Sequence, residues 1–347
     1  MFQVAVGSSD GYNAVMSWDM IGHEWAIEFL EHSFAKGSVR QAYLIMGPDR
    51  VGKRTMAIRL AQRLMCEDPE SGPCRQCSSC RQIAERRHPD LHVLEAEEID
   101  GTLKVDQVRE VQRQIALAPY QASNRVVLGL RAHEMSASAA NALLKTLEEP
   151  PDKVIIILTA RSEQALLPTM VSRCELLNLR PVPQQTLVDG LRQRLTGEKA
   201  DLLGPLAAGL PGLALALARD EEALQARQDA LAKLVELLSA GRIERFKFVA
   251  DFTRGRDLAA NRRKALDLLE VWLSFWRDVM LRSFGAQVPL SNPDQAEQIE
   301  GITRRLSDRM TARVVSEIEA SVDGINRNAN LQLCLENLML HLPRLTS

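Results

Sequence analysis

Apolar residues follow two different spacings in the first half of the chain. Short, mostly apolar runs that predict strands occur at residues 43–46, 91–94, 125–130 and 154–159, and the continuous run at 154–159 is typical of a strand buried on both faces. Apolar positions with helical spacing occur at residues 22–37, 54–65 and 105–116, and again between an N-cap at Ser136 and a stop at Pro150. This alternation predicts an α/β domain built on a doubly wound parallel sheet.

The second half of the chain shows no further strand pattern. Residues 184–222 predict short helices interrupted by Gly204-Pro205 and by the segment 209–212, and residues from 223 onward predict long helices only. The wide apolar stripe along 259–282 would form either a core or an assembly surface. We therefore expect four parts, in chain order a disordered leader at 1–15, an α/β domain at 16–181, a small helical domain at 182–222 and an all-helical domain at 223–347.

The segment from Gly47 to Lys53 has the spacing of a phosphate-binding P-loop and follows the first predicted strand. In such a loop the glycines let backbone N–H groups surround the phosphates, and the lysine reaches the outer ones. The next residue is normally Ser or Thr, whose hydroxyl binds Mg²⁺. Here it is Arg54, and Thr55 comes one position late, about 100° further round a helix. Gly47, Gly52, Lys53 and Thr55 are therefore candidate residues of a degenerate nucleotide site.

The second metal ligand of a P-loop ATPase is also missing. It is normally an acidic residue at the end of an apolar strand. The matching strand ends in Leu130 and continues to Arg131. The chain thus has the frame of a nucleotide motor without its Mg²⁺ ligands. ATP or ADP binding in the usual metal-dependent way is not expected, although Gly47, Gly52 and Lys53 remain to hold phosphate without metal.

Four of the six cysteines lie close together directly after the P-loop helix: Cys66, Cys74, Cys77 and Cys80. In a reducing compartment this clustering favours a metal over disulfides. Four thiolates match a structural zinc site, which has no open position for catalysis. An iron–sulfur cluster and plain reduced thiols are the alternatives. His88 could replace one ligand, but its position is more typical of the turn before the strand at 91–94.

The charge and the apolar stretches of the chain indicate which classes of protein are disfavoured. A net charge of −2 argues against a dedicated nucleic-acid-binding protein. A basic cluster beside the cysteines, formed by Arg75, Arg81, Arg86 and Arg87, could meet DNA phosphates, but the acidic residues around it favour a solvated surface. The N-terminal pattern is not that of a signal peptide, and no apolar stretch reaches membrane-spanning length, so a cytoplasmic protein is expected.

Several segments together resemble one family, the delta-prime subunits of the bacterial DNA polymerase III clamp loader. They are the strand at 42–44 that leads into the P-loop, the four-cysteine insertion, the stretch 139–151, the segment 167–174 that ends in Ser172-Arg173-Cys174, and the segment 328–338. The stretch 141–151 and the Ser-Arg-Cys triplet are more specific than the P-loop. The resemblance extends over about residues 20–347.

The resemblance implies an AAA+ module carrying a zinc module at 66–80, then a helical lid domain and a helical collar domain. It also implies that the collar joins five subunits, of gamma or tau, delta and delta-prime type, in a hetero-pentameric ring that loads the sliding clamp on primed DNA. Such a chain would be a subunit of the DNA polymerase III holoenzyme without ATPase or polymerase activity of its own. In this family the arginine that matches Arg173 reaches the ATP site of a neighbouring subunit, where a guanidinium stabilises the developing charge.

Three departures separate this chain from the motor subunits of such a ring. Motor subunits should carry Ser or Thr in place of Arg54, an acidic pair in place of Leu130-Arg131, and a basic residue in place of Leu213. These differences favour the non-hydrolysing subunit. The alternative, a gamma- or tau-like motor with an atypical metal site, would use Thr55 or Glu134 as metal contacts.

Two further alternatives concern single features. A zinc-dependent DNA-binding protein would also carry a cysteine cluster, but the acidic balance and the closed four-cysteine spacing disfavour it. Arg173, for its part, could be an ordinary surface arginine paired with Glu163 or Glu175.

Overall fold

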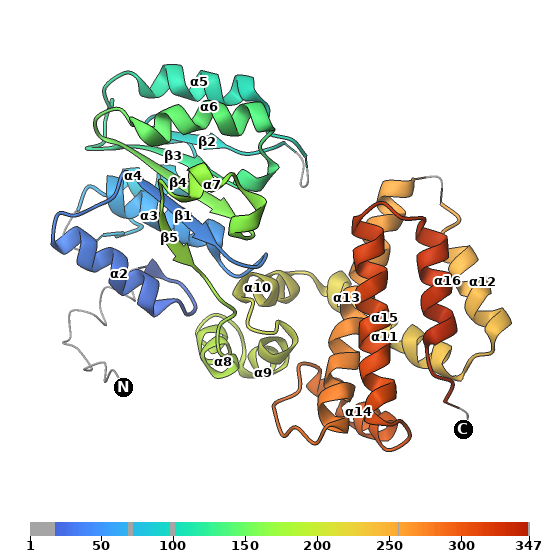
Figure 1. The fold of residues 1–347 in the computed structure, drawn as a ribbon. Helices are drawn as coiled ribbons and strands as arrows, with labels where there is room; N and C mark the ends of the chain where they lie inside the picture. Colours follow the sequence, from blue (N-terminus) through green and yellow to red (C-terminus); the bar gives the residue numbers. More distant parts are fainter. Residues whose placement is uncertain (1–17, 69–71, 98–100, 256, 346–347) are drawn as a thin grey trace. The chain divides into compact units, whose positions relative to one another are not determined.

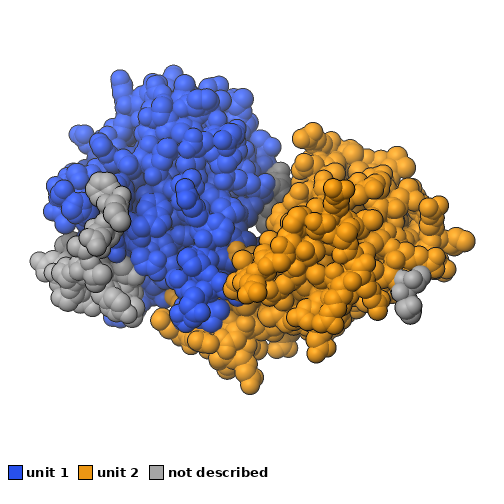
Figure 2. All heavy atoms as spheres, turned by 60° about the horizontal axis from the view of Figure 1, so that its bottom comes forward, with its two compact units in different colours: residues 1–190, 209–213 blue, residues 191–208, 214–347 orange. Residues whose placement is uncertain are grey.

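The computed structural model describes residues 18–68, 72–97, 101–255 and 257–345, and these residues divide into two units (Figure 2). Unit 1 contains the described residues up to Gly190 together with 209–213, and unit 2 contains 191–208 together with those from 214 onward. The expected leader at 1–15 lies outside the described residues. The separation of a lid from a collar near residue 222 stays a prediction.

One five-stranded parallel sheet forms the centre of unit 1, in the order β2-β3-β4-β1-β5 (Figure 1). Its strands are β1 (Ala42–Met46), β2 (Leu91–Leu94), β3 (Arg125–Gly129), β4 (Val154–Ala160) and β5 (Glu175–Asn178). The first four agree with the predicted strands. The strand β5 is not predicted from the sequence, because its two leucines are flanked by polar residues and form only a short apolar run. Since all strands are parallel, the segments after them meet at one edge of the sheet.

Helices cover both faces of the sheet. One face carries α2 (Glu24–Ala35), α3 (Lys53–Met65) and α4 (Ser78–Ala84), and the other carries α5 (Val105–Ile115), α6 (Ala137–Glu148) and the short α7 (Pro168–Val171). The two faces share the residues of β4 alternately: Ile155 and Ile157 belong to the first core, whereas Ile156 and Leu158 belong to the second. Burial on both sides explains the uninterrupted apolar run of this strand.

The described residues of unit 2 are helical and contain no strand. The boundaries between the two units fall within two helices, α8 (Gln184–Arg192) and α10 (Pro211–Arg219). The others are α9 (Gly197–Leu206), α11 (Glu221–Ser239), α12 (Arg242–Phe252), α13 (Leu258–Ser283), α14 (Ala296–Thr303), α15 (Asp308–Asn326) and α16 (Leu331–His341). The apolar stripe of α13 is core, since Leu269, Trp272 and Trp276 are fully buried. Gly204-Pro205 does not interrupt a helix as expected but lies in the last turn of α9.

No helix among the described residues combines the length and the apolar character that crossing a bilayer requires.

A buried ion pair fixes the loop between α5 and β3. The Asp90 carboxylate is fully buried and accepts hydrogen bonds from the backbone N–H groups of residues 120–122 at 2.7 to 3.0 Å. Arg125 donates to the same carboxylate at 3.2 Å and to the carbonyls of Leu117 and Ala118 at 2.9 and 2.8 Å. Although burial alone would raise the pKa of Asp90, these donors lower it from 3.8 to about 2.

The pair predicts how stability depends on pH. The depressed pKa of Asp90 stabilises the fold above pH 4, and this contribution, about 2 kcal/mol, is lost as the pH falls through 2. We expect Asp90→Asn to lower the free energy of unfolding by about 3 kcal/mol at neutral pH, because Arg125 is left buried without a counter-ion. Urea unfolding of both proteins at pH 7 and pH 3 measures this, and the difference between them should shrink at pH 3. Asp106→Asn, at an exposed pair with Arg109, is the control and should change little.

Candidate functional site: a P-loop edge, an exposed arginine and a cysteine cluster

The P-loop connects β1 to α3 and requires both of its glycines. Gly47 has a φ of +143° and Gly52 a φ of +117°, values that L side chains rarely adopt. A Cβ on Gly47 would also lie 2.2 Å from the carbonyl oxygen of Leu179. Gly52 is the N-cap of α3, so the helix starts directly at Lys53. The loop therefore has the backbone form that its sequence predicts.

The side chain of Lys53 hydrogen-bonds to carbonyl oxygens of its own loop. Its Nζ donates to the carbonyl oxygens of Gly47 and Pro48, each at 2.7 Å, and lies 3.3 Å from Oδ1 of Asp49. Burial lowers the pKa of the Lys53 ammonium, and the Asp49 carboxylate partly opposes that shift. Arg161, which follows β4, donates to the other oxygen of Asp49 at 2.8 Å.

The two arginines that replace the expected metal ligands meet at one carboxylate. Arg54 and Arg131 both pair with Oε1 of Glu95, the residue after β2, and Nη1 of Arg131 lies 2.5 Å from that oxygen. Arg86 donates to Oε2 of Glu95 at 2.9 Å. The positions identified from sequence as one metal site are thus adjacent in space, and an arginine–glutamate network fills their surroundings.

The replacements considered for the missing ligands are poorly suited to metal binding. Thr55 is exposed on the first turn of α3. Glu134 is buried, and both of its carboxylate oxygens lie 2.8 Å from Nε of Arg131. A carboxylate held by a guanidinium in this way is already neutralised.

Arg173 lies just after the short helix α7 and remains accessible. Its side chain is 33% exposed; Nη2 lies 2.7 Å from Oε1 of Glu148 at the end of α6, and Nη1 donates to the carbonyl of Thr169 at 2.8 Å. The partner is therefore Glu148 rather than Glu163 or Glu175. An exposed ion pair of this kind contributes little to stability, so the guanidinium is available to a partner at small cost.

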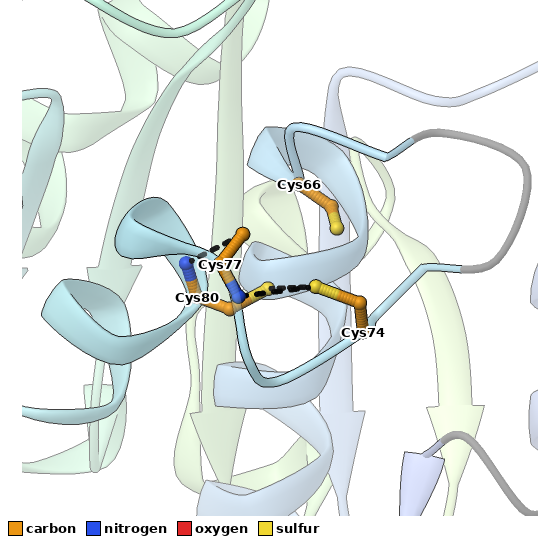
Figure 3. Close-up of side chains that lie close together, drawn as sticks. All are labelled: Cys66, Cys74, Cys77 and Cys80. Atoms are coloured by element: carbon orange, nitrogen blue, oxygen red, sulfur yellow. Dashed lines mark hydrogen bonds between the residues drawn. The ribbon is translucent and has the colours of Figure 1, made fainter.

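Four thiols converge beside the end of α3 (Figure 3). The Sγ atoms of Cys66, Cys74, Cys77 and Cys80 all lie within 4.8 Å of one another. Tetrahedral zinc with Zn–S bonds of about 2.3 Å needs sulfur atoms about 3.8 Å apart, so the cluster fits such an ion after small adjustments. The cluster can hold a metal ion.

Backbone N–H groups support the same cluster. The N–H of Cys77 points to Sγ of Cys74 at 3.4 Å, and the N–H of Cys80 points to Sγ of Cys77 at 3.3 Å. Although burial opposes ionisation, these contacts with the backbone and neighbouring thiols lower the pKa of Cys74 to about 7. His88 is not part of the cluster, because its Nδ1 accepts from the N–H of Asp90 in the turn before β2.

The basic cluster near the cysteines is largely paired. Arg75 pairs with Asp19, Arg86 with Glu95 at 2.9 Å and Arg87 with Glu85 at 3.4 Å. These pairs reduce the positive potential that a DNA backbone would require.

Comparison with known proteins identifies the family. The family model described as DNA polymerase III, delta subunit, matches residues 22–183. DNA polymerase III subunit delta' of Escherichia coli is 30% identical over 324 residues, which cover 91% of this chain and 92% of that protein. This chain belongs to the delta-prime family of clamp-loader subunits.

Other relatives include a second type of subunit. Subunit delta' of Bacillus subtilis is 28% identical over 91% of this chain and 94% of that protein. Subunit tau of the same organism is 25% identical over 89% of this chain and 57% of that protein. The resemblance to the delta-prime family found in the sequence is therefore confirmed.

We use the name P-loop edge for the P-loop together with the segments that follow the parallel strands at the same edge of the sheet. Three of its residues were not predicted from the sequence: Asp49, Glu95 and Arg161. Each had a signal, since Glu95 and Arg161 directly follow strands and Asp49 lies within the P-loop itself. Because the ends of parallel strands share one edge, a charged residue after each strand was a candidate. The strand order needed to pair them came only with the structure.

Proposed function

We propose that this chain is a non-hydrolysing subunit of a DNA polymerase III clamp loader and supplies Arg173 to the ATP site of a neighbouring subunit. The non-hydrolysing role is supported by the ion pairs that Arg54 and Arg131 both form with Glu95. It puts two fixed positive charges where an ATPase needs ligands for Mg²⁺, and like charges repel a divalent cation. The exposure of Arg173 supports its proposed role at the ATP site of a neighbouring subunit.

The proposed partners follow from the relatives. This chain would join gamma- or tau-type and delta-type subunits in a hetero-pentameric ring, with its helical C-terminal part as the collar, and would contact the sliding clamp and primed DNA as part of that complex. The helices α11 to α16 supply a stable core for this role. The motor alternative has less support, because Glu134 is engaged by Arg131.

Mg²⁺-dependent ATP turnover by the purified full-length chain tests the non-hydrolysing role. We expect no turnover above a preparation of Lys53→Ala, since no Mg²⁺ ligand is in place. Turnover that Lys53→Ala abolishes would instead establish a motor with an atypical metal site.

The metal of the cysteine cluster is proposed to be structural zinc. Four thiolates, three from the segment between α3 and α4 and one from α4, would close a tetrahedral site and fix the insertion at 66–80, without a position for substrate. An iron–sulfur cluster and free thiols are the alternatives that measurement must exclude.

We expect about one zinc ion per chain, bound by four thiolates. Metal analysis of the purified protein measures the ion, and thiol titration before and after chelation shows the protected cysteines. Cys74→Ser should lose most of the zinc, whereas Cys334→Ala, outside the cluster, should keep it. Iron with visible absorption would indicate a cluster, and four reactive thiols without metal would contradict the proposal.

A further inference from the structure

The P-loop edge carries five cationic side chains in two ion-pair groups, Lys53 and Arg161 around one carboxylate and Arg54, Arg86 and Arg131 around another. They come from α3, from the end of α4 and from the segments after β3 and β4. Among the described residues, the carboxylates paired with these cations include Asp49, Glu95 and Glu134. Ammonium and guanidinium groups gathered in this way are the groups that bind oxyanions.

Two of those carboxylates occupy the groups that would otherwise meet phosphates. Asp49 is a residue of the P-loop itself, and it lies 3.3 Å from Nζ of Lys53 and 2.8 Å from Nε of Arg161. Although burial would raise the pKa of Asp49, the charges of Arg161 and Lys53 lower it below its usual value. Asp49 thus remains ionised between the lysine and the arginine.

Glu95 has the same function for the other three cations. Its Oε1 accepts from Arg54 and Arg131, and its Oε2 accepts from Arg86. The carboxylate links α3, the end of α4 and the segment after β3. A nucleotide's phosphates and their Mg²⁺ would link two of these elements in a P-loop ATPase, the helix after the P-loop and the segment after β3.

The P-loop edge also contains the imidazole ring of His133. Both ring nitrogens of His133 are buried and have no hydrogen-bond partner among the described residues. Burial, assisted by the charge of Arg161, lowers the pKa of His133, so the ring is neutral at pH 7 and keeps one N–H to donate. Because a buried polar group without a partner is costly, the edge retains unused capacity for a ligand.

We propose that Asp49 and Glu95 are built-in counter-ions that take the place of phosphate groups, and that the same edge without them binds a polyphosphate in the absence of metal. A carboxylate tethered within the chain acts at a high effective concentration and outcompetes a free anion. The edge therefore stays assembled without nucleotide. This inference goes beyond the proposed function and does not depend on Arg173.

The test uses the full chain with Asp49→Asn and Glu95→Gln combined, and inorganic pyrophosphate in the presence of EDTA as the probe. Titration calorimetry should show saturable binding of one pyrophosphate, about fivefold tighter than to the unaltered chain, since an exposed competing ion pair corresponds to at most roughly that factor. Adding Lys53→Ala to the double variant should remove the gain.

A matched control separates this site from a general charge effect. Asp106→Asn with Glu85→Gln makes the same change in net charge at exposed pairs elsewhere, and it should leave pyrophosphate binding unchanged. Asp49→Asn alone, at a side chain 56% exposed, keeps the fold and should show part of the gain. Equal binding by the unaltered chain, equal gains in the control, or no gain in a folded Asp49→Asn chain would each overturn the proposal.

Discussion

Replacing Arg173 by alanine is expected to lower ATP cleavage at the site that receives it by on the order of a thousandfold. A guanidinium presents two N–H groups to phosphate oxygens and stabilises charge as it develops in the transition state. The substitution should leave assembly unchanged, because Arg173 contributes only an exposed ion pair with Glu148 and a bond to one carbonyl. Single-turnover hydrolysis in a ring with one competent ATP site measures the effect.

Three variants control this prediction. Arg180→Ala removes an exposed arginine further along the same segment and should not change the rate. Arg173→Lys keeps the charge but loses the planar geometry, so an intermediate loss is expected. Glu148→Gln frees the guanidinium and should not reduce the rate. If Arg173→Ala hydrolyses ATP as fast as the unaltered complex, the proposed role of Arg173 is wrong.

Replacing Arg245 by methionine is expected to destabilise the helical C-terminal part by about 4 kcal/mol. Arg245, in α12, is 5% exposed and donates to backbone carbonyls at the ends of two other helices. Its acceptors are Leu237 in α11 and Met339, Leu342 and Pro343 in and after α16, at 2.7 to 3.0 Å. These carbonyls have no other helical partner and carry the negative end of the helix dipole. A buried methionine would leave them unsatisfied.

Urea unfolding followed by the fluorescence of Trp272 and Trp276, which are buried in the same core, measures this loss. The matched control is Arg254→Ala, since Arg254 follows the same helix but its side chain is 85% exposed. We expect a change of at most about 0.5 kcal/mol for the control. A similar midpoint for Arg245→Met and the unaltered protein would show that the bonds to the carbonyls contribute little.

The sequence predicted the features that depend on neighbouring residues. The strand β2 and the helix α6 with its cap at Ser136 occur where expected, because apolar spacing and capping act over a few residues. The cysteine cluster was also predictable, since three of its members lie within seven residues. Its local helix α4 was not predicted, because turn-forming residues dominate the segment before it.

The features that the sequence did not predict depend on contacts between residues that are far apart along the chain. Glu95 is 41 residues from Arg54 and 36 from Arg131, and no local pattern connects them. Two of the carbonyls to which Arg245 donates, those of Met339 and Leu342, are more than 90 residues away at the end of α16. Such pairs follow from the order of the strands and the packing of the helices, which periodicity alone does not fix.

The most direct test of the account is ATP turnover in the complete complex when only this chain keeps its P-loop lysine. This measurement extends the test on the isolated chain, because a neighbour would complete an atypical metal site only within the ring. The partners' P-loop lysines would be replaced by alanine, and Mg²⁺-dependent turnover would be measured with Lys53 intact. The account predicts no turnover above background. Turnover that depends on Lys53 would contradict it and show that this chain hydrolyses ATP.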